Sequence, residues 1–122
     1  MTIQKIAIAG SSGRMGRTLL EAVTQAGDLC VAAALEMADS PFLGKDAGEL
    51  IGSRNGVAIT SDHEAALRGC DYIIDFTRPA GTLAHLEVCR VAGVKMVIGT
   101  TGFSAEEKDL LRAASEDIAI VF

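Results

Sequence analysis

Residues 3–16 read IQKIAIAGSSGRMG, an apolar run followed by a glycine-rich turn and the start of a helical pattern. This order predicts a buried parallel strand that leads directly into a turn and a helix. Gly10 allows the sharp exit from the strand, Gly13 lets the backbone approach a phosphate, and Gly16 lets the helix lie close to the strand. The N-terminus of such a helix points free N–H groups and a partial positive charge at an anion. The stretch therefore predicts a site for the pyrophosphate of a dinucleotide.

The sequence after the turn supports this interpretation. Apolar residues at helical spacing occupy positions 14–26, and an apolar strand is predicted over 29–35. That strand leads to Glu36, at the distance from the turn where a dinucleotide-binding fold places the carboxylate that accepts the ribose hydroxyls. Taken alone, the pattern G-x-x-G-x-x-G, with Ser12 at the usual second glycine, fits any strand–turn–helix connection, and Glu36 fits a solvated strand end.

Composition limits the class of protein. The chain has 122 residues, of which 49% are hydrophobic and 22% charged, which is typical of one globular domain and excludes disorder. A net charge of −5 makes nucleic acid an unexpected partner. Cys30, Cys70 and Cys89 stand singly in apolar runs, which indicates buried reduced thiols rather than a disulfide or metal site. No apolar run has the length of a signal peptide core or a membrane span, so we expect a cytoplasmic protein without membrane contact.

Strands and helices alternate along the rest of the chain. Residues 37–55 are expected to form a surface excursion with one short helix at 46–51. Further strands are expected at 57–60, 71–76, 95–98 and 118–122, and helices at 61–69, at 79–93 and from 104 onward. The alternation predicts an α/β fold, a Rossmann-type doubly wound parallel sheet of about six strands in three layers.

Two helices are expected to begin with capping boxes, at 61–64 and at 104–107. Leu110 is expected to face inward from the second of these helices. His63 reads as an exposed residue of a first helical turn, and His85 as a structural or solvated histidine. Because the two histidines are isolated in the sequence pattern, and no carboxylate pair or Lys–His constellation is evident, we assign no catalytic residue and no metal ligand.

Ligands of such sheets bind at the carboxyl ends of the strands. Four of these ends carry glycine or polar groups, and we expect them to line one crevice. The candidate cofactor-binding residues are Gly10, Ser11, Ser12, Gly13, Arg14, Met15, Glu36, Met37, Phe76, Arg78, Gly99, Thr100 and Thr101.

Five strings carry a family resemblance over the whole chain. They are GSSGRMG (10–16), ALE (34–36), DAGEL (46–50), IDFTRP (74–79) and VIGTTGF (97–103). In combination they closely resemble 4-hydroxy-tetrahydrodipicolinate reductase, also called dihydrodipicolinate reductase. The resemblance implies a bacterial enzyme of lysine and diaminopimelate biosynthesis that reduces a cyclic substrate with NADH or NADPH. It also implies that residues 10–15 hold the pyrophosphate, Glu36 the adenosine ribose, and residues 99–101 the nicotinamide side.

The resemblance covers only one part of that family's architecture. There, a second domain follows the sixth strand and brings a catalytic histidine and lysine, the substrate-binding groups and the tetramer contacts. We therefore expect residues 1–122 to be the dinucleotide-binding domain, cut before the second domain, monomeric and inactive alone, with a homotetrameric full-length enzyme. A nucleotide-sensing module and a dehydrogenase of another small acid, such as aspartate, are the alternatives, and the DFTRP and GTTGF strings argue against that dehydrogenase.

One position departs from the family in a way that concerns cofactor choice. Many members follow the acidic residue with an arginine that meets the 2′-phosphate of NADPH, whereas this chain has Met37. Arg14 and Arg78 are the alternative phosphate partners. We expect both cofactors to be accepted, with a preference for NADH.

Overall fold

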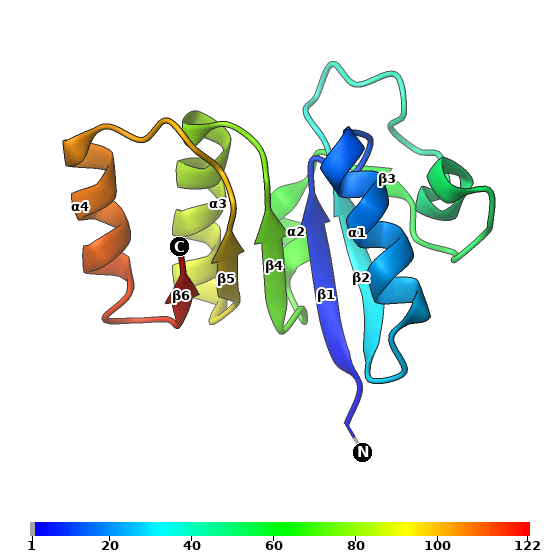
Figure 1. Cartoon of the computed structure of the whole chain (residues 1–122), viewed down its shortest axis with the longest axis horizontal. Helices are drawn as coiled ribbons and strands as arrows, with labels where there is room; N and C mark the ends of the chain where they lie inside the picture. The colour runs from blue at the N-terminus through cyan, green and yellow to red at the C-terminus, as the bar shows by residue number, and fades with distance from the viewer. Residues whose placement is uncertain (1) are drawn as a thin grey trace.

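The computed structural model describes residues 2–122. Its strands are β1 (Gln4–Ala9), β2 (Leu29–Leu35), β3 (Ile59–Thr60), β4 (Tyr72–Asp75), β5 (Lys95–Ile98) and β6 (Ile120–Val121). Its helices are α1 (Arg14–Gln25), α2 (His63–Leu67), α3 (Pro79–Ala92) and α4 (Ala105–Ala114), with a 3₁₀ helix, η1 (Ala47–Ile51). All six strands form one parallel sheet in the order β3-β2-β1-β4-β5-β6 (Figure 1). The predicted fold class is confirmed.

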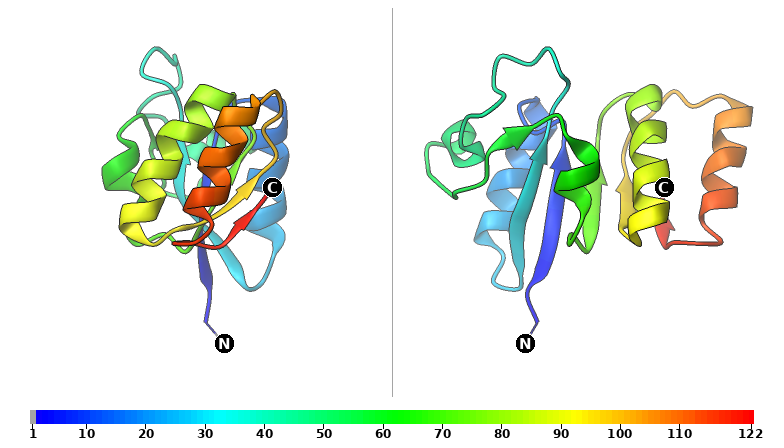
Figure 2. Two further views of the ribbon diagram at one scale, coloured as in Figure 1. Left: turned by 90° about the vertical axis from the view of Figure 1, so that its left-hand side faces the viewer. Right: turned by 180° about the vertical axis from the view of Figure 1, so that it is seen from behind.

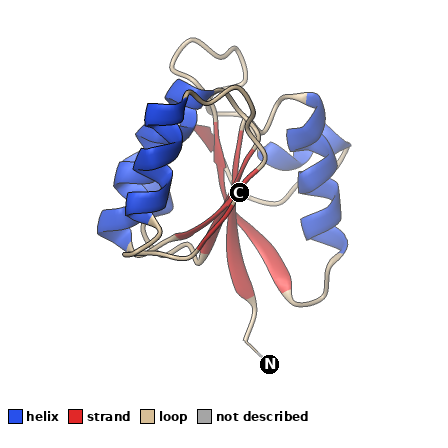
Figure 3. Ribbon diagram, turned by 60° about the vertical axis from the view of Figure 1, so that its left-hand side comes forward, coloured by secondary structure: helices blue, strands red, loops and turns tan. Residues whose placement is uncertain are grey.

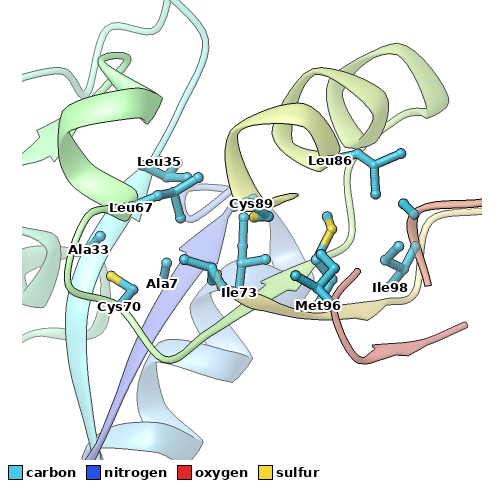
Figure 4. Close-up of a cluster of buried hydrophobic side chains, with 14 of the residues drawn as sticks. Ala7, Ala33, Leu35, Leu67, Cys70, Ile73, Leu86, Cys89, Met96 and Ile98 are labelled. Atoms are coloured by element: carbon cyan, nitrogen blue, oxygen red, sulfur yellow. The ribbon is translucent and has the colours of Figure 1, made fainter. Parts of the chain in front are cut away.

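Alternation along β1 divides the core into two layers. Ile6 and Ile8 pack with α1 and η1 on one face of the sheet. Ala7 and Ala9 belong to the cluster on the other face, which α2, α3 and α4 cover (Figures 3 and 4). The small alanines let these helices approach the sheet closely. Helices therefore lie on both sides of one sheet, which gives the three predicted layers.

The face that α1 covers continues beyond that helix. α1 packs on β1 and β2, while Ile74, Val97 and Val121 follow one another in register across β4, β5 and β6. Ile74 and Val97 are half-buried, and Val121 is 67% exposed. Figure 2 shows the molecule from the side and from behind, where α3 and α4 cover the opposite face of these strands.

Several local expectations are corrected. α2 is capped by Asp62, whose side chain accepts the N–H of Ala65, and not by Ser61. The capping box of Ser104 and Glu107 is present as predicted. Leu110 is 55% exposed rather than inward-facing. β3 and β6 are two residues long, shorter than the strands predicted at 57–60 and 118–122.

The order of the strands reverses between β1 and β4. The chain proceeds outward from β1 through β2 to β3, and from β4 outward through β5 to β6. The carboxyl ends of β1 and β4 therefore lie side by side, with helices leaving toward opposite faces (Figure 1). Open parallel sheets bind ligands at such a switch point.

Within residues 2–122, no helix is long and apolar enough to cross a membrane.

Candidate dinucleotide-binding site

The N-terminus of α1 lacks any capping side chain. Gly13 is its N-cap residue, and the first turn holds no acidic residue. The N–H of Arg17 bonds to the carbonyl of Gly13 at 3.0 Å, whereas no acceptor in residues 2–122 meets the N–H groups at positions 14–16. These donors, together with the helix dipole, suit an anion.

The glycines of the turn have different tasks. Gly10 has φ +72° and reverses the chain at the end of β1. A Cβ at Gly16 would overlap the carbonyl of Gly10 and the backbone of Ser11, so this position holds helix against strand. A Cβ at Gly13 would meet only the carbonyl of Gly10, at 3.4 Å. The packing of the protein therefore requires glycine at position 16. At position 13 the protein itself leaves room for a side chain, so a glycine there leaves space for a ligand at the turn.

Glu36 lies directly beside the turn. The N–H and the hydroxyl of Ser12 both donate to the same oxygen of Glu36, at 2.7 and 2.6 Å. No donor among residues 2–122 meets the second oxygen. The carboxylate is thus oriented with one oxygen available to hydroxyl groups of a ligand.

Arg17 was not among the predicted site residues. Its Nε donates to the carbonyl of Ser12 at 2.9 Å, and its guanidinium lies 5.7 Å from the ring centre of Phe42. Lys45 approaches the same ring at 5.6 Å. Two cations therefore flank Phe42 at the start of α1, and together with Asp46 they line a small pocket. The position of Arg17, one turn after Gly13, is the only sequence signal for this arrangement.

The loops after β4 and β5 meet each other and the glycine turn. The N–H of Thr77 bonds to the hydroxyl of Thr100 at 3.0 Å. A Cβ at Gly99 would overlap the ring of Phe76, while a Cβ at Gly10 would lie 3.1 Å from the methyl group of Thr77. The four strand ends predicted to line one crevice are therefore neighbours.

Not every candidate side chain points outward. Ser11 is fully buried, and its hydroxyl bonds to the carbonyl of Leu35; Thr100 is 4% exposed and bonds within the protein. Ser11 therefore presents no accessible atom to a ligand, and Thr100 presents almost none. The side chains of the following candidates are exposed: Arg14, Met15, Met37, Phe76, Arg78 and Thr101. A pocket beside the loop that follows β5 is lined by residues 98–103, Lys108 and Phe122.

A buried polar cluster lies beneath the carboxyl ends of β4 and β5, and it was not predicted. Asp75 and His85 are bonded at 2.6 Å and are 0% and 3% exposed. Burial alone would raise the pKa of Asp75, but hydrogen bonds from His85 and Thr77 outweigh it and hold the pKa below its usual range. The sequence signals the burial of His85, because Thr82, His85 and Cys89 share the helical spacing of the buried face of α3, but it does not signal the pairing with Asp75.

His63 and His85 are not isolated from each other, contrary to expectation. Their ring centres lie 4.5 Å apart, and Nε2 of His63 is 3.2 Å from the carbonyl of Glu36. His63 is half-buried rather than exposed, and burial lowers its pKa. Within the described residues, no three His, Cys, Asp or Glu side chains form a group suited to a metal ion.

Comparison with known proteins identifies the family of the chain. Residues 4–122 match the family described as "Dihydrodipicolinate reductase, N-terminus". The chain is 62% identical over 122 residues to 4-hydroxy-tetrahydrodipicolinate reductase of Nitrosomonas eutropha, and the match covers all of this chain and 46% of that protein. The chain thus spans about half the length of the curated relatives it matches.

Solved structures share the fold. The dipicolinate-bound dihydrodipicolinate reductase from Paenisporosarcina sp. TG-14 superposes with a TM-score of 0.73 at 26% identity, over 95% of this chain and 44% of that one. The WlbA dehydrogenase from Thermus thermophilus, in complex with NAD and alpha-ketoglutarate, has a TM-score of 0.73 at 16% identity, over 97% of this chain and 40% of that one, and shows the fold alone. From the family match, the chain belongs to the dihydrodipicolinate reductase family, of which it represents the N-terminal region.

Proposed function

We propose that residues 1–122 bind a nicotinamide dinucleotide and form the cofactor half of a reductase that acts on the dihydrodipicolinate-type intermediate of lysine and diaminopimelate biosynthesis. One observation carries the proposal: the uncapped N-terminus of α1 lies directly beside the carboxylate of Glu36, which Ser12 orients. A dinucleotide needs an anion site and a hydroxyl acceptor at this separation along the fold. When bound, the cofactor supplies a hydride from its nicotinamide ring.

Each strand end has its own task in this proposal. The N–H groups at positions 14–16, with residues 10–15 around them, hold the pyrophosphate. The available oxygen of Glu36 accepts the adenosine ribose hydroxyls. Residues 99–101, with Phe76 against Gly99, receive the nicotinamide end. We assign Arg78, the N-cap residue of α3, to balance phosphate charge.

We further propose that NADH binds at least as well as NADPH. A 2′-phosphate would bring negative charge to the carboxylate of Glu36, and Met37, 67% exposed, offers no cation. Arg14, the first residue of α1, and Arg17, whose Nε donates to the carbonyl of Ser12, are the cations that we assign to reduce this penalty. The domain therefore accepts both cofactors with a preference for NADH.

The rest of the enzyme's chemistry lies outside this domain in our proposal. Family resemblance assigns the catalytic histidine and lysine, the substrate-binding groups and the tetramer contacts to a C-terminal domain. Residues 1–122 alone would then be a monomer without measurable reductase turnover, since positioned acid–base groups commonly contribute about 10²–10⁴ in rate. Three free cysteines fit the reducing cytoplasm.

Titration with NADH tests the proposal. Nicotinamide fluorescence should change saturably as protein is added, and ADP-ribose should compete, because it carries the pyrophosphate and the adenosine ribose. Tyr72 is the only tyrosine and the chain has no tryptophan, so protein emission interferes little. Absence of saturation at millimolar concentrations of both ligands would refute the proposed function.

A further inference from the structure

We infer that Asp75 and His85 are positioning residues, which hold the loops after β4 and β5 in the arrangement that receives the nicotinamide end of the cofactor. This inference rests on the proposed function. In this inference the buried pair Asp75 and His85 aligns the nicotinamide half of the dinucleotide, while the adenosine half binds at Ser12 and Glu36.

The bonds of Asp75 converge on one loop. Asp75 is the last residue of β4, and its Oδ1 accepts both the N–H of Thr77, at 3.1 Å, and its hydroxyl, at 2.6 Å. Oδ2 accepts Nδ1–H of His85 from α3, because an ionised carboxylate can only accept. Thr77 is thereby fixed relative to both β4 and α3, and Phe76 is held between two fixed residues.

Thr100 connects this arrangement to the next strand end. Its hydroxyl accepts the N–H of Thr77 at 3.0 Å and the hydroxyl of Thr82 at 2.8 Å, and it donates to the carbonyl of Asp75 at 3.2 Å. The loop that carries Phe76 and the loop that carries Gly99 are therefore joined by buried hydrogen bonds. These are the two loops whose close contact excludes any side chain at position 99.

Stability alone does not account for a charged residue at this depth. Replacing a buried charged group and its partner by apolar residues of similar volume is often neutral or stabilising, because the cost of removing the charge from water offsets its interactions. Nε2 of His85 has no hydrogen-bond partner among the described residues, so the pair is not even fully satisfied. The pair supplies hydrogen bonds that fix the orientation of the Thr77 backbone and side chain, and apolar residues would not supply them.

The test compares two ligands on folded variants. In Asp75→Leu/His85→Leu the pair is replaced by apolar residues, and circular dichroism and thermal melting verify folding. We expect the affinity for ADP-ribose to stay within about twofold of wild type, whereas the affinity for NADH falls by about tenfold and the fluorescence change of bound NADH is lost. Asp75→Asn keeps an acceptor for Thr77 and should restore most of the NADH affinity.

A control and a second variant complete the design. Leu86→Ala removes a buried side chain from the same helix without touching the polar cluster, and should leave the ratio of the two affinities unchanged. If the double variant does not fold, Thr100→Val, which removes only the bridging hydroxyl, should lower NADH affinity selectively.

The outcomes separate the two claims. If wild-type protein binds neither ligand, the proposed function fails and the inference with it. If wild type binds both ligands but NADH no more tightly than ADP-ribose, or if the variants lose both equally or neither, the proposed function stands and the positioning role is overturned.

Discussion

Ser12 donates two hydrogen bonds to a single oxygen of Glu36, one from its backbone N–H over 2.7 Å and one from its hydroxyl over 2.6 Å. The two residues lie 24 positions apart in the sequence. Ser12 lies in the turn after β1, and Glu36 directly follows β2. These two hydrogen bonds join the glycine turn to the residue that follows β2, and they leave the second carboxylate oxygen of Glu36 available. A glycine at position 12 would supply only the N–H bond to Glu36.

Removing the carboxylate should weaken binding of the ribose. Glu36→Ala is expected to lower NADH affinity by about ten- to a hundredfold, because hydrogen bonds to charged groups contribute about 1.5–3 kcal/mol. NADPH affinity should fall less, since repulsion of the 2′-phosphate disappears with the carboxylate. Calorimetric titration with both cofactors measures the effect. Asp39→Ala, which removes an exposed carboxylate from the next loop, is the control and should change neither affinity.

A cation at position 37 should shift cofactor preference. Met37→Arg places a guanidinium beside Glu36, where a charge-assisted bond to the 2′-phosphate is expected to raise NADPH affinity by about tenfold relative to NADH. The two dissociation constants are compared at one ionic strength, because the contact is screened by salt. A wild-type protein that already prefers NADPH tenfold, or an unchanged ratio in the variant, would contradict the placement of both residues at the ribose.

Folding stability should decline as the pH falls below 6.5, in part through His63. Burial lowers the pKa of His63 below its ordinary 6.5, so the unfolded chain takes up the proton first and stability is lost between 6.5 and the lower folded pKa. Thermal melting from pH 7.5 to 5 should therefore show a smaller decline for His63→Gln than for wild type. Identical declines would show that His63 keeps its ordinary pKa in the folded protein.

A second loss of stability is expected in stronger acid. The pKa of Asp75 is held below its ordinary 3.8, so its contribution is present above 3.8 and disappears as the pH falls toward the folded value. This loss begins at a lower pH than that of His63, near 3.8 rather than 6.5. Thermal melting of Asp75→Asn and wild type below pH 4 should show a smaller decline for the variant, and identical declines would contradict the lowered pKa.

The three cysteines should differ in reactivity. Burial raises the pKa of the Cys89 thiol to about 12 and also raises the pKa of Cys70. Since the thiolate is the reactive form, iodoacetamide at pH 8 should modify half-buried Cys30 first and leave the other two intact until the protein unfolds. Peptide mass mapping locates the modified residue. Modification of Cys89 in the folded protein at the rate of Cys30 would be inconsistent with the described core.

Local patterns predicted most of the fold, because the succession of strands and helices along the chain, the helical spacing and the glycine positions are local properties. The turn at residues 10–16 and the helix beginning at Pro79 follow from their own sequence. The pairing of Asp75 with His85 and the stacking of His63 on His85 depend on how α2 and α3 pack on the sheet, and no short string encodes that packing. The predicted N-cap of α2 was wrong because Ser61 and Asp62 are both residues that cap helices well, and the local sequence does not decide between them. In the structure Asp62 caps the helix.

The central claim is that the glycine turn receives a dinucleotide, and Gly13→Val tests it most directly. Gly13 has φ −73°, which any residue adopts, and its missing Cβ has open space except for one carbonyl at 3.4 Å. Gly27→Val, at the far end of α1, where a Cβ meets nothing within 4 Å, is the matched control. Calorimetric titration with NADH should give saturable binding to wild type and to Gly27→Val, and none to a Gly13→Val protein with unchanged circular dichroism. Wild-type affinity in Gly13→Val would contradict the account.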